Sequence, residues 1–365
     1  MQNTNIQLKP TQPSINEAQN DNFHPEPSDN NPRIKTLFLA EHGTTLGKEH
    51  ERFTLKKDGK IIKRIPLIHV NQIMIFGNSQ LTTQVMQFCL QQNIPIYLLS
   101  GQGRYFGMID AFSTDSVTLH KQQFKQADNP RFCLELAKQL IKGKISNTRL
   151  ILKRLTRHRQ AQAFENGSIK LNASLRQISQ AQTLDQLRGI EGNAAHIYFQ
   201  AIATTVDPKW NFHKRNKQPP TDPINAMLSY GYTLLFYNVY SFLRTRGLNP
   251  HIGHLHAMRT GHPALASDLM EEFRSIIVDA VVLNIVLNNK LNTEDFEIKN
   301  NYACHLNAKA RGLFIRQIEN KLNAAITHPV NGLKLDYRRC IEHQVKNLAN
   351  HIKNPETPYQ PCILR

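Results

Sequence analysis

At residues 128–141 the chain reads Asp128-Asn-Pro-Arg-Phe-Cys-Leu-Glu-Leu-Ala-Lys-Gln-Leu-Ile141, and here the character of the sequence changes. Asn129 before Pro130 is typical of a helix start, because the Asn side chain can cap free backbone N–H groups and the proline ring suits the first helical position. Apolar residues then recur at three- and four-residue spacing. The same periodicity continues at residues 181–204, 223–246, 263–288, 306–326 and 336–352. We therefore predict a helical domain over residues 122–355.

Upstream of this point the patterns are those of strands and turns. Residues 53–62 indicate a hairpin around Asp58-Gly59, a pair that supplies the positive backbone angles of a tight turn. A helix is predicted over 81–92, and further strands over 34–40, 65–70, 72–76, 94–99, 104–111 and 117–120. The fold class predicted is therefore α+β, with a small β-rich domain over residues 34–121 followed by the larger helical domain.

The two ends of the chain are predicted to be tails. Residues 1–33 are rich in Asn, Gln, Pro, Ser and Asp, and such a segment cannot bury enough apolar surface to offset its ordering entropy. We expect it to be disordered, and expect residues 356–365 to form a C-terminal tail.

The charge of the chain favours a polyanionic partner. Lys and Arg number 45 against 28 Asp and Glu, which gives a formal charge of +17. An anionic membrane is the weaker interpretation, because the most apolar stretch, residues 276–287, is interrupted by Asp279 and Asn284. The N-terminus has no apolar signal-peptide core, and the five cysteines are scattered without a C-x-x-C pair. These features suit a cytoplasmic DNA- or RNA-binding protein and argue against a zinc knuckle.

One acidic side chain stands within an apolar helical stripe. Glu191 shares a predicted helix face with Leu184, Leu187 and Ala194, and a buried lone carboxylate is costly unless it is paired or binds a metal. The alternative is an ion pair with Arg188, almost one turn earlier.

A histidine-rich loop and an acidic helix follow. His256 ends the predicted loop 249–256 and can offer a neutral imidazole to a metal. The alternatives are solvated loop histidines or a zinc cluster of His251, His254, His256 and His262.

Asp268 and Glu271 lie three residues apart on one helix face, and Glu272 lies four from Asp268; the alternative for these acids is a solvated acidic face. Two carboxylates and one imidazole form a ligand set that suits Mg²⁺ or Mn²⁺.

A basic loop is interleaved with aromatic residues at 210–220. Lys214, Arg215 and Lys217 follow Trp210 and Phe212, a combination suited to phosphates and to stacking on bases. The alternative is a plain surface loop. Further basic residues cluster in an earlier predicted helix, at Lys142, Lys144, Arg149, Lys153, Arg154, Arg157 and Arg159.

Taken in order, these segments resemble the universal CRISPR adaptation integrase, the first of the CRISPR-associated proteins. The resemblance runs from about Ile34 to the C-terminus. It is carried by Arg64-Ile-Pro-Leu67, Gly77, Ile94-Pro95 with Ser100 and Gly103, Lys142-Gly-Lys-Ile-Ser-Asn147, Leu187-Arg-Gly-Ile-Glu191-Gly, Pro219-Pro-Thr-Asp222-Pro-Ile-Asn225-Ala-Met-Leu-Ser229-Tyr-Gly-Tyr232 and, most specifically, Asp268-Leu-Met-Glu271-Glu-Phe-Arg274.

The resemblance implies a small β-sandwich domain followed by a helical catalytic domain. It implies that Glu191, His256 and Glu271 are the catalytic metal ligands for Mg²⁺ or Mn²⁺, with Asp268 as an auxiliary acid. The sequence departs from the family at His254, where the family usually has Phe, and the spacing favours His256 as the ligand.

The activity implied is that of a metal-dependent DNA endonuclease and integrase, which inserts new spacer DNA into a CRISPR array through attack by a 3′-hydroxyl. We expect Lys214, Arg215, Lys217 and Arg274 to contact DNA. The family forms homodimers through the β domain and assembles with a small second CRISPR-associated protein. Two alternatives stay open: a nuclease acting on branched DNA in repair, and a non-catalytic DNA-binding scaffold.

Overall fold

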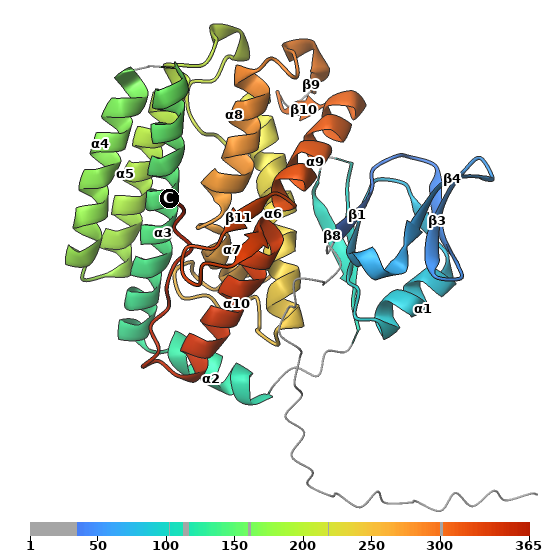
Figure 1. Ribbon diagram of the computed structural model, residues 1–365, viewed down its shortest axis with the longest axis horizontal. Helices are drawn as coiled ribbons and strands as arrows, with labels where there is room; N and C mark the ends of the chain where they lie inside the picture. Colours follow the sequence, from blue (N-terminus) through green and yellow to red (C-terminus); the bar gives the residue numbers. More distant parts are fainter. Residues whose placement is uncertain (1–34, 102, 112–116, 160–161, 218, 300–301) are drawn as a thin grey trace, which may run out of the picture. The chain divides into compact units, whose positions relative to one another are not determined.

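The fold is α+β, as the sequence predicts: a β region is followed by a largely helical remainder (Figure 1). The computed structural model describes residues 35–365 apart from 102, 112–116, 160–161, 218 and 300–301. The tail predicted over residues 1–33 lies outside the described residues.

Two four-stranded sheets make up the β region. The first sheet has the order β1-β5-β7-β8, in which β1, β5 and β7 are parallel and β8 is antiparallel to β7. Its strands are β1 (Lys35–Leu39), β5 (Val70–Phe76), β7 (Ile96–Leu99) and β8 (Tyr105–Ile109). The second sheet has the order β4-β3-β2-β6, with β2 (Thr44–Glu49), β3 (Arg52–Lys57), β4 (Lys60–Pro66) and β6 (Gln80–Leu81). The predicted hairpin is confirmed, because β3 and β4 are joined at Asp58 and Gly59, both with positive φ.

Strand β5 connects the two parts of the fold through its alternating side chains. Ile73 and Ile75 lie in a core shared with the second sheet and with α1 (Thr83–Gln91). Met74 and Phe76 point the other way and lie in the core of the helical part. The central strand is therefore buried on both faces, as is usual for parallel strands.

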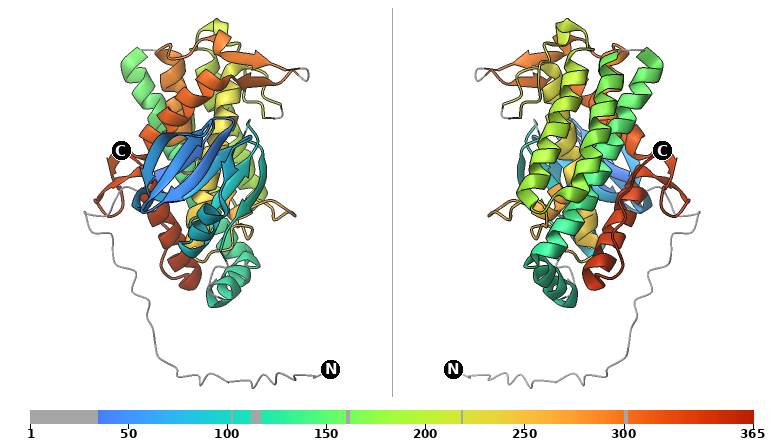
Figure 2. Two further views of the ribbon diagram at one scale, coloured as in Figure 1. Left: turned by 90° about the vertical axis from the view of Figure 1, so that its right-hand side faces the viewer. Right: turned by 90° about the vertical axis from the view of Figure 1, so that its left-hand side faces the viewer.

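Ten α-helices lie in the described part of the chain, and all but α1 follow the strands of the two sheets. The C-terminal eight follow one another as α3 (Pro130–Arg159), α4 (Gln162–Gln177), α5 (Leu184–Ala203), α6 (Pro223–Thr245), α7 (Ala264–Met270), α8 (Ala280–Leu287), α9 (Ala308–Leu322) and α10 (Tyr337–Lys353). Helices α3, α4 and α5 lie side by side (Figure 2). Two short hairpins complete this part, formed by β9 (Phe296–Ile298) with β10 (Cys304–Leu306) and by β11 (Ala325–Thr327) with β12 (Lys334–Asp336). None of the helices that the structure describes is both long and apolar enough to cross a bilayer.

One predicted strand is wrong. Residues 117–120 begin the helix α2 (Val117–Ala127), whose buried positions Leu119, Gln123 and Gln126 follow helical spacing. Two of these three buried residues are glutamines, so a search for apolar periodicity does not find the helix. By contrast, the predicted start of α3 is confirmed, because Asn129 Oδ1 accepts from the backbone N–H groups of Arg131 and Phe132 at 3.1 and 3.2 Å.

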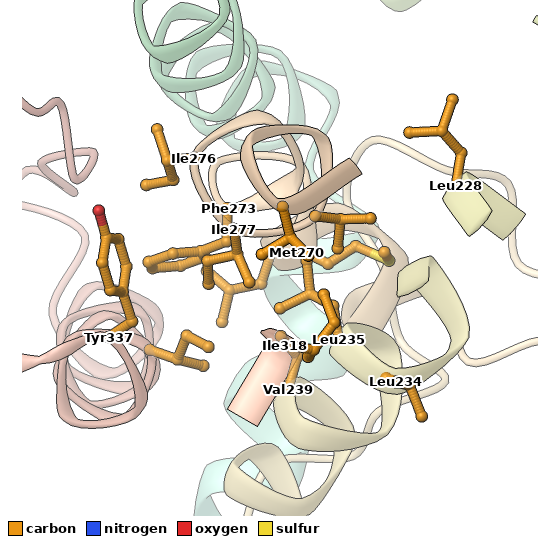
Figure 3. Packing of buried hydrophobic residues seen from close by; sticks show 14 of the residues in the cluster. Leu228, Leu234, Leu235, Val239, Met270, Phe273, Ile276, Ile277, Ile318 and Tyr337 are labelled. Atoms are coloured by element: carbon orange, nitrogen blue, oxygen red, sulfur yellow. The ribbon is translucent and has the colours of Figure 1, made fainter. Parts of the chain in front are cut away.

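Helix α6 forms the centre of the helical part. Its buried residues lie on nearly every side of the helix, which is expected only for a helix surrounded by others. Leu235 and Val239 pack against Met270, Ile277 and neighbouring side chains from the segment that carries the predicted acids (Figure 3). The segment that carries the acids is therefore held against the hydrophobic core around α6.

A fully buried guanidinium connects the two parts of the fold. Arg338, in α10, forms an ion pair with Glu319 in α9 and donates from Nη2 to Thr36 Oγ1 in β1 at 3.0 Å. Gln72 in β5 donates to Thr36 Oγ1 and to Asn238 Oδ1 in α6, at 2.6 and 2.9 Å. The network joins two strands to three helices.

We predict that Arg338→Ala lowers the free energy of unfolding by about 3–5 kcal/mol, because it removes one partner of a buried ion pair and leaves the others unsatisfied. Chemical denaturation measures this loss. The matched control is Arg316→Ala in α9, where the side chain is exposed and we expect a change within about 0.5 kcal/mol. Equal losses in the two variants would contradict the interpretation.

Candidate active site

Four side chains that are distant in sequence meet at one point. Glu191 comes from α5, Glu271 directly follows α7, His256 lies in the loop between α6 and α7, and Lys144 comes from α3. The Lys144 ammonium forms an ion pair with Glu191 and lies 2.7 Å from Glu271 Oε2. The His256 Nε2 atom lies 4.0 Å from Glu271 Oε1. The three predicted ligands are thus brought together, around a lysine for which no role in the site was predicted from the sequence.

Glu271 is a buried carboxylate that stays ionised. Its side chain is only 4% exposed, and burial alone would raise its pKa. The charges of Arg274 and Lys144 outweigh that effect and lower the pKa of Glu271 to about 2. The negative charge of this group is therefore maintained by two neighbouring cations.

Lys144 occupies the position between Glu191 and Glu271 where a cation would bind both carboxylates. Among the described residues, no three His, Cys, Asp or Glu side chains converge closely enough to form a ready-made metal site. At Glu191 and Glu271 the reason is visible, since the Lys144 ammonium lies between the two carboxylates. A divalent cation could bind both acids only by displacing it.

Arg188, the alternative partner of Glu191, is used elsewhere. Its guanidinium pairs with Asp185 at 2.7 Å and donates to the backbone oxygen of Leu255 at 2.7 Å. Glu191 therefore pairs across to α3 rather than along its own helix.

Asp268 supports the histidine loop. Its Oδ2 atom accepts from the backbone N–H groups of His254 and Leu255, at 2.6 and 3.0 Å. Its Oδ1 atom bonds to the backbone N–H of His256 at 2.9 Å and to His256 Nδ1 at 2.7 Å. A β-carbon at Gly253 would come within 3.0 Å of Asp268 Oδ2, so glycine is needed for this close approach. The carboxylate predicted as an auxiliary acid thus lies behind His256 and holds its Nδ1, which leaves Nε2 facing Glu271.

The two candidate histidines lie in different environments. His254 is 3% exposed, its ring packs against Phe132, and burial lowers its pKa to about 4. The His256 side chain is 38% exposed and borders the acids. Of the two histidines, it is therefore His256 that lies beside the acids.

The Glu272 carboxylate is hydrogen-bonded to the C-terminal segment. It accepts hydrogen bonds from the Tyr359 hydroxyl at 2.6 Å and from the Cys362 backbone N–H at 2.8 Å. Tyr359 and Cys362 are buried, so residues expected to form a tail pack against the helix that carries Glu271. No sequence pattern indicated this contact.

A basic cavity of about 530 Å³ opens beside the acids. The four residues predicted to contact DNA all line this cavity: Lys214, Arg215, Lys217 and Arg274. Lys144, Glu191 and Tyr232 also line it. Lys214 and Lys217 are exposed, whereas Arg215 donates to Asn225 Oδ1 at 2.8 Å and to Ser229 Oγ at 3.0 Å. Arg215 therefore also anchors the basic loop to the start of α6.

The chain matches one protein family over most of its length and has relatives that are more than 30% identical. The model of the family described as CRISPR associated protein Cas1 matches residues 37–320. A relative from Thermus thermophilus, named CRISPR-associated endonuclease Cas1 3, is 34% identical over 334 residues, which cover 91% of this chain and 98% of the relative. A CRISPR-associated endonuclease Cas1 1 from Chlorobaculum tepidum is 31% identical over 339 residues, covering 91% and 99%.

Solved structures share the fold. A casposase bound to integration product is similar with a TM-score of 0.77 and 23% identity, over 88% of this chain and 91% of that one. A chain of a Cas6-RT-Cas1–Cas2 complex is similar with a TM-score of 0.76 and 25% identity, over 91% of this chain. The match spans 36% of that longer chain.

We predict that Asp268→Asn destabilises the protein by about 1–3 kcal/mol, because an amide nitrogen must then face a backbone N–H or His256 Nδ1 in a buried site. Chemical denaturation measures the loss. The control, Asp185→Asn, affects an exposed ion pair and should change stability by less than about 1 kcal/mol. Wild-type stability of Asp268→Asn would show that the loop does not depend on this carboxylate.

Proposed function

The chain belongs to the Cas1 family of CRISPR-associated proteins, and from this premise we propose that it is a divalent-metal-dependent DNA endonuclease and integrase. In this proposal it inserts spacer DNA into a CRISPR array. The observation that carries the proposal is the convergence of Glu191, Glu271 and His256 at the edge of a basic cavity. Buried acids inside so basic a protein have no evident use in a DNA-binding scaffold.

The residues present fit one Mg²⁺ or Mn²⁺ ion. Glu191 and Glu271 already share one cation, the Lys144 ammonium, and His256 Nε2 faces Glu271. Oxygen and imidazole donors of this kind suit these metals. When bound, such an ion would stabilise the charge that develops on a scissile phosphate.

The reaction proposed is direct transesterification. The 3′-oxygen of the incoming duplex loses its proton to solvent and forms a bond to phosphorus. The bond from phosphorus to the 3′-oxygen of the target strand breaks, and that oxygen takes up a proton and leaves as a free 3′-hydroxyl. Lys214, Lys217 and Arg274 bind the DNA phosphates from the walls of the cavity. Their positive charges neutralise the negative charges of the DNA backbone. Asp268 keeps His256 oriented throughout.

We propose double-stranded DNA, a second copy of this chain and the small second CRISPR-associated protein as partners. A structural neighbour is a chain of a Cas6-RT-Cas1–Cas2 complex, which supports the last of these. In the β region, Ile68 and Phe106 are largely exposed, which supports the proposal that this region forms the homodimer contact.

We predict that purified protein joins a duplex with free 3′-hydroxyls to a plasmid carrying CRISPR repeats when Mg²⁺ or Mn²⁺ is present. His256→Ala should reduce joining by about 100-fold or more, as expected for a group that acts in the transition state. His254→Phe should keep it, because His254 is buried against Phe132 and does not border the acids. Gel analysis of labelled duplex measures the product.

Other outcomes would overturn parts of this account. Loss of joining in His254→Phe but not in His256→Ala would reverse the choice of histidine. Cutting without joining, even with the small second CRISPR-associated protein added, would favour a nuclease acting on branched DNA. Unchanged DNA processing by Glu271→Gln would favour a non-catalytic scaffold.

We predict that Lys144→Met lowers the stability of the metal-free protein by about 2–4 kcal/mol, because two carboxylates lose a shared cation. The same variant should bind Mn²⁺ about tenfold more tightly, because the ammonium no longer competes for the same oxygens, and a tighter ligand raises the melting temperature further. Thermal denaturation with EDTA and with Mn²⁺ measures both effects.

Lys142→Met is the matched control, since Lys142 is exposed on the same helix. It should leave both quantities unchanged. If Lys144→Met gained no more from Mn²⁺ than Lys142→Met, the lysine and the metal would not share the two carboxylates.

A further inference from the structure

Asp279 is a buried acid that the proposed chemistry does not use. It is 3% exposed and is one of the residues that line the basic cavity. The Tyr232 hydroxyl donates to its Oδ1 atom at 2.6 Å. Burial raises the pKa of Asp279 to about 6, an effect opposed by its bonds to tyrosine and by two arginines. A group kept at this cost inside a cavity calls for a role.

The local helix geometry brings Asp279 to the same side as Arg274. These two residues are the ends of a π-helical turn, Arg274–Asp279, between α7 and α8. In an α-helix, residues five apart point about 140° away from each other around the axis. A turn with i→i+5 hydrogen bonds brings them closer together, and such turns are frequent at functional sites. Both side chains thus face Tyr232.

The Arg274 guanidinium lies between the Glu271 carboxylate and the Tyr232 ring, and both attract it. Its Nε atom lies 3.3 Å from Glu271 Oε1, and its guanidinium carbon lies 4.7 Å from the centre of the Tyr232 ring. Arg215 also approaches this ring, at 5.5 Å. A cation beside an aromatic face is attracted by it, more strongly when both are removed from water. Without Tyr232 and Asp279, Glu271 would be the dominant attraction on Arg274.

We propose that Tyr232 and Asp279 are positioning residues that keep the Arg274 guanidinium directed into the cavity, where it binds a phosphate of the DNA. The inference rests on the proposed function, which supplies the DNA. Asp279 fixes the tyrosine hydroxyl and provides a second negative charge near the arginine. Tyr232 provides the ring against which the guanidinium lies. Neither residue touches the reacting phosphate itself.

A double-mutant cycle on DNA binding tests this inference. The four proteins are wild type, Tyr232→Phe, Arg274→Gln and the double variant, and the probe is one blunt duplex of fixed length. Fluorescence anisotropy gives the dissociation constant over a series of salt concentrations, well below the lowest melting temperature of the four. Arg274→Gln should reduce the slope of log affinity against log salt by about one, as expected for one lost phosphate contact.

Tyr232→Phe keeps the ring but removes the hydroxyl that Asp279 holds. We expect it to weaken binding by about threefold to tenfold in the wild-type background, within the range of coupling between contacting residues. In the Arg274→Gln background the same change should weaken binding by less than about twofold. Only a residue that acts through Arg274 gives this non-additivity; a general loss of packing would affect both backgrounds equally.

Tyr230→Phe is the matched control. Tyr230 lies on the same helix two residues earlier, is buried, and has a hydroxyl without a hydrogen-bond partner among the described residues. It should bind the duplex like wild type. The inference is overturned if Tyr232→Phe binds like Tyr230→Phe, or if its effect is the same in both backgrounds.

The strand-transfer assay separates this inference from the proposed function. Non-additive binding together with no joining by wild type would refute the integrase proposal and leave the positioning pair supported. If wild type joined DNA but the effects of the two substitutions on binding were additive, the integrase proposal would be supported and the positioning pair refuted.

Discussion

The site depends on one ion-pair arrangement: the Lys144 ammonium lies between the carboxylates of Glu191 and Glu271. Three helical segments must come together to build it, and each carboxylate would repel the other without a cation between them. Because Glu271 is almost fully buried, its charge is tolerable only with Lys144 and Arg274 beside it. The same requirement explains how these acids persist in a protein with a formal charge of +17.

A single stretch of helix, residues 264–279, distributes its acids over different tasks. Asp268 is used entirely by the backbone and ring of the histidine loop, and Glu272 by the C-terminal segment. Of these acids, Glu271 alone pairs with Lys144, while Asp279 accepts a hydrogen bond from Tyr232 in the wall of the basic cavity. Four carboxylates that look alike in the sequence therefore differ in function because of what surrounds each one. The π-helical turn adds to this separation, since it changes the direction of the side chains that follow Arg274.

The α+β order and the helix starts could be predicted because they rest on local signals, such as the Asn129 cap and the Asp58-Gly59 turn. The convergence of Glu191, His256 and Glu271 followed from resemblance and spacing. Lys144 could not be singled out, because its role exists only where α3 meets α5 and α7, and in the sequence it is one basic residue among many. The hydrogen-bond partners of Asp268, Glu272 and Tyr359 were not predicted for a similar reason: those partners lie between 12 and 90 residues away in the sequence. Helix α2 was taken for a strand because its buried face consists largely of glutamine.

The most direct measurement is a crystal structure of the protein soaked in Mn²⁺, with the metal located by anomalous scattering. The account predicts one strong peak at coordination distance from carboxylate oxygens of Glu191 and Glu271 and from His256 Nε2, with the Lys144 ammonium moved away from both acids. Asp268 should keep its bonds to the loop and contribute no ligand. A peak that excludes either glutamate, or an unmoved Lys144 with the metal bound elsewhere, would contradict the account.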